Sequence, residues 1–131
     1  MERLVADFKG DLRVELHHNP LAMHKNAYDA AAAARAAQRQ GKFWEYHEGL
    51  LQSRSFDRTT LVGLASGIGL DRDQFVRDFD DSKLRAQVTA EAKEAYDANA
   101  LGTPGFLING HVEVGWASLP WLEQVIRTHA R

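Results

Sequence analysis

The residues in this chain that can carry chemistry are six histidines, three tryptophans and scattered hydroxyl and carboxyl groups, because the sequence has no cysteine. Thiol-disulfide exchange requires a thiolate, so the 131 residues hold no such chemistry by themselves. A serine or threonine nucleophile needs a neighbouring base and an orienting acid. The sequence has neither a Gly-x-Ser-x-Gly elbow nor a glycine-rich phosphate loop. We therefore predict no catalytic residue and no cofactor.

Three histidines that lie close together in the sequence, His17, His18 and His24, are the candidate metal ligands. His17 and His18 would point to opposite faces of a strand, and neither an acidic pair nor a second histidine pair stands at ligand spacing. Surface and helix-cap roles are favoured, and no metal site is predicted.

The aromatic residues offer a weaker signal. His47 follows Phe43 at helical spacing, which favours a packed core histidine over a catalytic base. Trp44, Trp116 and Trp121 could form a ligand-binding patch, but core packing is the favoured role for them.

The most specific local feature is the run LGTPGFLING at residues 101–110, in which Thr103-Pro104 leads into a short apolar stretch and Asn109-Gly110. Asn-Gly is a strong hairpin signal because both central residues of a type I′ turn need positive φ. The run predicts an antiparallel pair of strands over residues 106–108 and 112–114.

The elements around this hairpin follow from hydrophobic periodicity. A helix is predicted over Arg3 to Phe8, and the alternation in Leu12 to Leu16 predicts a strand with one buried face. A closing helix is predicted after Ser118, which would cap it.

Between residues 26 and 99 the pattern is helical throughout, and the capping residues divide it into five helices. The predicted helices follow Asn26, span Lys42 to Leu51, follow Asp57, follow Asp71, and begin at Ser82. The order is therefore helix, strand, helical block, hairpin and helix.

This order resembles the DsbA-like family of thiol-disulfide oxidoreductases. The similar runs are His18-Asn19-Pro20-Leu21, His24-Lys25-Asn26-Ala27, residues 41–47 (GKFWEYH), Gly102-Thr103-Pro104 and Asn109-Gly110. The resemblance implies one α/β domain over residues 1–131, with a thioredoxin-like fold and a DsbA-type helical insertion at about 26–99. The chain departs from the family by lacking Cys-x-x-Cys, by a glycine at position 105 and by a methionine at position 23.

The resemblance also implies a binding role for the loop Gly102, Thr103, Pro104 and Gly105. In the family the peptide bond before this proline is cis, and the preceding backbone pairs with an extended peptide. A structural turn retained by the fold is an equally favoured interpretation.

Three functions remain open. The resemblance implies a thiol-disulfide oxidoreductase by ancestry, redox-inactive here because these 131 residues contain no cysteine. The alternative is a non-catalytic module that binds peptide or protein, or assembles with itself. A weaker alternative is a relative of glutathione-dependent isomerases and kappa-class transferases.

The family's first strand and the start of its active-site helix would lie upstream of Met1, so the chain resembles a truncated member. That strand is central, between Leu12 to Leu16 and Phe106 to Ile108, and unpaired buried backbone groups cost about 1 to 3 kcal/mol each. We expect a homodimer that fills the gap. The competing outcomes are closure of the two flanking strands onto each other and an upstream segment that supplies the strand.

Composition narrows the choice of partners. A net charge of −2 with scattered cations predicts no nucleic-acid partner. No run approaches the roughly 20 apolar residues that span a bilayer, so no membrane partner is expected. Because residues 1–131 show no signal-peptide pattern, a cytoplasmic location is expected for them, although a full-length family member could be exported.

Overall fold

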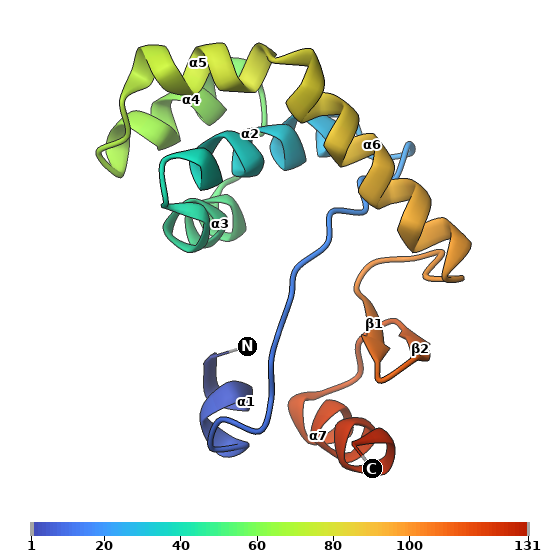
Figure 1. Ribbon diagram of the computed structural model, residues 1–131. Coiled ribbons are helices and arrows are strands. Elements are labelled where there is room, and N and C mark those ends of the chain that lie inside the picture. The colour runs from blue at the N-terminus through green and yellow to red at the C-terminus, as the bar shows by residue number, and fades with distance from the viewer. Residues whose placement is uncertain (1, 131) are drawn as a thin grey trace. The chain divides into compact units, whose positions relative to one another are not determined.

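A computed structural model describes residues 2–130 (Figure 1). The chain divides into two compact units, one over residues 18–93 and the other over residues 1–17 and 94–131. Within the described residues, no helix is both long enough and apolar enough to cross a membrane.

The first unit is the helical block, and its five predicted helices are confirmed. They are α2 (Ala27–Arg39), α3 (Phe43–Gln52), α4 (Arg58–Gly67), α5 (Arg72–Asp80) and α6 (Ser82–Asp97), the last of which continues into the second unit. Alanines line the buried side of α2, and small side chains let α3 and α5 pack closely against it. The aromatic rings of Tyr46, Phe75 and Phe79 fill the core between these helices.

Of the four helix caps predicted in this unit, two are confirmed and two are wrong. Asp57 accepts the Thr60 N–H, and Asp71 accepts the Gln74 N–H. Asn26 precedes α2 in a left-handed conformation with φ 70°, where its side chain makes no capping bond. At the start of α6, Asp81 accepts the Lys83 N–H at 2.9 Å and takes the capping role predicted for Ser82.

The second unit contains α1 (Glu2–Asp7), β1 (Gly105–Ile108), β2 (His111–Val114) and α7 (Leu119–His129). The predicted hairpin is confirmed, and Asn109 and Gly110 both have positive φ. Ser118 caps α7 by accepting the Trp121 N–H at 3.2 Å.

One face of the hairpin packs on α7. Phe106 and Ile108 of β1 contact a buried cluster made by Leu4, Leu122 and Ile126. Because paired residues point to the same face of a sheet, Glu113 and His111 of β2 share this face with Phe106 and Ile108.

The strand predicted over Leu12 to Leu16 is wrong. Half-buried and exposed side chains alternate along the segment as predicted, but the segment does not form a strand. Within the described residues the sheet consists of β1 and β2 alone, so no strand, β1 included, pairs with residues 12–16. A strand is held by hydrogen bonds to a neighbour, and residues 2–130 offer this segment none.

Candidate functional site: the proline loop and the outer edge of β1

The Thr103-Pro104 peptide bond is cis, as the family resemblance implied. Both residues are exposed. The Gly115 N–H donates to the Pro104 carbonyl oxygen at 2.7 Å and so extends the hairpin pairing into the loop. The backbone of Thr103 makes no hydrogen bond to another residue in the described part of the chain.

The two glycines of the loop are positions of close approach. A Cβ at Gly102 would lie 2.9 Å from Cγ1 of Val114, and a Cβ at Gly105 would lie 3.2 Å from the backbone oxygen of Gly102. The glycine at 105 departs from the family pattern, but here the backbone of the same loop occupies the space that a side chain would need. The loop is therefore built tightly against the hairpin.

The outer edge of β1 continues this exposed backbone. In an antiparallel pair, alternate residues direct their N–H and C=O groups to the partner and away from it. The Gly115 N–H donates to the Pro104 carbonyl oxygen, so Pro104 is one of the residues whose backbone polar groups point towards β2. By alternation, the backbone N–H and C=O groups of Phe106 and Ile108 also point towards β2. Gly105 and Leu107 therefore present their backbone groups at the other edge, where no strand of residues 2–130 pairs.

Four exposed apolar side chains lie on the hairpin or within four residues of it in the sequence: Leu101, Leu107, Val114 and Trp116. Trp116 lies beside Phe106, with ring centroids 6.4 Å apart. We call these four side chains, with the backbone of Thr103, Gly105 and Leu107, the β1 edge site.

The predicted core role of the tryptophans holds for one of them. Trp121 is half-buried and packs against the cluster of the second unit. Trp44 and Trp116 are both about half exposed, so core packing is wrong for these two. The Trp44 ring lies against Phe43 and His47, and the Trp116 ring lies against Phe106, so each has one side covered and the other exposed to solvent.

Within residues 2–130, the candidate ligands His17, His18 and His24 do not belong to a cluster of three or more potential metal ligands. His17 lies 3.7 Å from Glu15 and 3.8 Å from Glu94, and His24 is exposed. The backbone N–H of His18 donates to Glu91 at 2.7 Å.

His47 packs in the helical unit as predicted. Its ring stacks on Phe43 with centroids 5.7 Å apart and meets Trp44 edge-on. Burial lowers the pKa of His47, and the nearby Glu48 carboxylate opposes this shift. These contacts favour a packing role for the His47 side chain.

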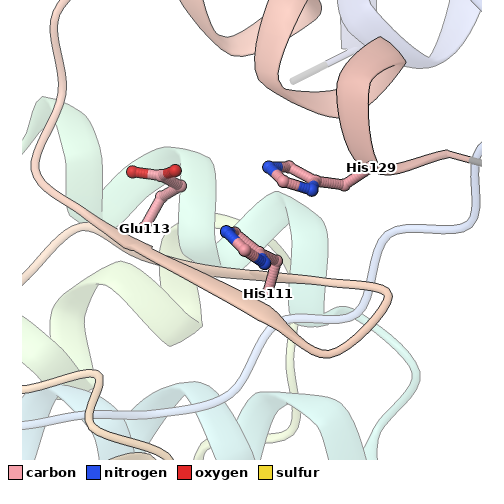
Figure 2. Close-up of side chains that lie close together, drawn as sticks. All are labelled: His111, Glu113 and His129. Atoms are coloured by element: carbon pink, nitrogen blue, oxygen red, sulfur yellow. The ribbon is translucent and has the colours of Figure 1, made fainter.

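The structure also gathers three residues that sequence reasoning missed. His111, Glu113 and His129 bring their side-chain ligand atoms within 4.8 Å of one another. Figure 2 shows the three side chains, with the two histidine rings next to each other. The His-x-Glu spacing next to the predicted strand was a usable signal for the first two, since residues two apart in a strand share a face. Only the tertiary fold adds His129.

Comparisons with known proteins identify a family and a fold. The sequence model of the DsbA-like thioredoxin domain matches residues 2–127. A crystal structure of a thioredoxin-like oxidoreductase from Silicibacter pomeroyi DSS-3 superposes with a TM-score of 0.78 at 23% identity, covering 96% of this chain and 76% of that chain. At that identity the superposition shows the fold.

Two curated relatives are much longer proteins. The Na(+)/H(+) antiporter NhaA of Herminiimonas arsenicoxydans is 32% identical over 108 residues, which are 82% of this chain and 17% of the antiporter. An antiporter NhaA 1 of Mycolicibacterium vanbaalenii is 37% identical over 127 residues, which are 92% of this chain and 20% of that protein. The chain thus spans about a fifth of the length of these relatives.

Proposed function

The chain belongs to the family of DsbA-like thioredoxin domains, and since it has no thiol we propose that it works as a strand-binding module of that family. Its ligand is an extended polypeptide segment, which pairs with Thr103 and the outer edge of β1. Disulfide exchange, where it accompanies this binding, needs cysteines from outside the 131 residues.

The observation that carries the proposal is the row of backbone groups along the β1 edge site. Gly105 and Leu107 point their N–H and C=O groups away from β2, and Thr103, two residues before Gly105, makes no backbone hydrogen bond within residues 2–130. Added strands bind through such alternating groups and gain specificity from side-chain contacts on either face. Unpaired edges of this kind pair with an available strand.

The surrounding side chains favour an apolar ligand. Leu107 is 64% exposed, and Val114 and Trp116 are also exposed. Covering apolar surface contributes about 25 cal/mol per Å². A segment with β-branched or aromatic residues at alternate positions would cover these side chains while its backbone pairs with β1.

The test is a titration of the ¹⁵N-labelled chain with a cysteine-free decapeptide that alternates valine and lysine. We expect amide shift changes concentrated at Thr103, Gly105 and Leu107, and a rise in polarisation of the fluorescein-labelled peptide. Leu107→Asp should abolish binding, because a carboxylate replaces the central apolar contact.

Leu51→Asp is the matched control, because Leu51 is 68% exposed but lies on α3. It should leave peptide affinity unchanged. Shift changes spread over the helical unit, or equal losses in the two variants, would contradict the proposal.

The alternative function is catalytic, with the chain supplying the proline loop to cysteines on another polypeptide segment. Membership of the family supports it. The isolated chain should show no dithiothreitol-dependent reduction of insulin above the buffer blank, since sulfur is needed for the exchange. Activity that survives removal of contaminating thiols would show a chemistry that the residues do not explain. Ion transport, named for the antiporter relatives, is not proposed for this chain.

A further inference from the structure

The group formed by His111, Glu113 and His129 lies on the second unit, on the face of β2 that packs towards α7. His111 and Glu113 are two residues apart on β2 and therefore share a face. In Figure 2 the His111 and His129 rings lie next to each other, with the Glu113 carboxylate beside them.

A tight turn, a side-chain hydrogen bond and the packing of α7 hold the three side chains near one another. The Asn109-Gly110 turn fixes the register of β2 against β1. The Asn109 side-chain amide donates to the His129 carbonyl oxygen at 2.9 Å, which ties the hairpin turn to the end of α7. Leu122 and Ile126 anchor α7 in the core of this unit.

The distances suit a single small cation. One ligand atom from each residue lies within 4.8 Å of the other two. Metal–ligand bonds of about 2.0 to 2.2 Å in a tetrahedral site place neighbouring ligand atoms about 3.3 Å apart. The ring centroids of His111 and His129 are 3.8 Å apart at 19°, so both rings would rotate out of this stacked arrangement to turn one nitrogen each towards a shared ion.

The chemistry of the donor atoms selects the metal. Two imidazole nitrogens and one carboxylate oxygen are typical ligands of Zn²⁺, whereas Mg²⁺ and Ca²⁺ prefer oxygen. We propose that His111, Glu113 and His129 form a Zn²⁺ site, with the fourth position open to water or an external ligand. The ion would clamp β2 to the C-terminal end of α7.

This clamp goes beyond the proposed strand binding and does not depend on it. A ligand that binds only the folded state raises stability in proportion to the logarithm of its concentration over Kd. The second unit, which carries the proline loop, would therefore gain stability from Zn²⁺.

The test is isothermal titration of the untagged, metal-free chain with ZnCl₂ at neutral pH, together with thermal unfolding in the presence and absence of the ion. We expect one ion per chain and a rise in Tm. Co²⁺ in place of Zn²⁺ should give the intense visible absorption of a four-coordinate site. Mg²⁺ at the same concentration should change neither readout.

The variants His111→Asn, Glu113→Gln and His129→Asn should each weaken Zn²⁺ affinity at least about tenfold, by analogy with the loss from outer-shell changes alone. His17→Ala is the matched control, because it removes a histidine near two carboxylates outside the group. Unchanged circular dichroism of the metal-free variants would show that they fold. The absence of stoichiometric binding, an affinity unchanged in the three ligand variants, or a loss confined to His17→Ala would overturn the proposal and leave the two rings as a stacked pair only.

Discussion

At the residue scale, the helical unit contains a buried carboxylate, Glu91, which is only 6% exposed. It forms an ion pair with Arg35 of α2 and accepts the backbone N–H of His18 at 2.7 Å. Arg35 leaves its Nε without a hydrogen-bond partner in the described chain, so the pair is incompletely satisfied. A buried pair of this kind costs most when one member is removed, because the other charge is left without compensation.

We predict that Arg35→Met lowers the free energy of unfolding by about 3 kcal/mol, since Glu91 would remain buried without its cation. Urea denaturation at neutral pH measures the change. Arg58→Met is the control, because Arg58 and Asp80 pair at 2.7 Å with side chains 53% and 50% exposed. Surface pairs contribute less than about 1 kcal/mol. Similar losses in both variants would show that the burial of Glu91 has no special weight.

His47 gives the helical unit a pH dependence. Burial lowers its pKa in the folded state, so the unfolded chain binds more protons than the folded chain as pH falls through the ordinary histidine pKa of about 6.5. The contribution of His47 to stability is therefore complete above that pH and decreases below it. We predict that the midpoint urea concentration of unfolding decreases when the pH is lowered from 7.5 to 5.5. His47→Gln should make this decrease smaller. An equal decrease in the variant would assign the effect to other groups.

At the scale of elements, the helices are set by their caps, and Asp71 is the clearest case. Its carboxylate accepts the Gln74 N–H at 2.7 Å at the start of α5. This bond satisfies one of the four unpaired donors in the first turn of the helix. The aromatic residues Phe75 and Phe79 on α5 then project into the core.

We predict that Asp71→Ala lowers the free energy of unfolding by about 1 kcal/mol, the usual cost of losing an N-cap. Asp71→Asn should retain most of the stability because the amide oxygen still accepts the Gln74 N–H. Thermal unfolding of the three proteins measures the difference. Equal Tm values for the alanine variant and the unmodified chain would show that α5 is held by packing alone.

At the scale of the whole molecule, the outer edge of β1 can pair with a second copy of the chain as well as with a peptide. A twofold arrangement would pair the same edge in both copies. The segment Leu12 to Leu16 also lacks a neighbouring strand within residues 2–130. The homodimer expected from the sequence therefore remains a prediction, and β1 is the edge that the structure favours for it.

We predict a dimer mass in sedimentation equilibrium at micromolar concentration. Leu107→Pro should give a monomer, because the Leu107 N–H points away from β2 and its loss leaves the hairpin bonds intact. The valine–lysine decapeptide should compete with dimer formation if both use the β1 edge site. A clean monomer mass for the unmodified chain would exclude self-assembly at this concentration and leave peptide binding as a separate question.

The sequence by itself determined the features that depend on residues close together along the chain. Positive φ at Asn109 and Gly110 gave the hairpin, and the short polar side chains of Asp57, Asp71 and Ser118 gave three helix starts. The absence of cysteine fixed what chemistry the chain lacks. These properties need only a turn, a cap or a composition, so distant residues do not change them.

The tertiary structure decided the features that need partners from elsewhere in the chain. Leu12 to Leu16 has the alternation of a strand, but strand formation also requires a neighbour, and none pairs with it in residues 2–130. His129 lies 18 positions after His111 in the numbering, and only the packing of α7 against the hairpin brings their rings together. Strand pairing and clusters of potential metal ligands both depend on contacts between segments that are distant in the sequence. A local sequence pattern does not specify which segments come into contact.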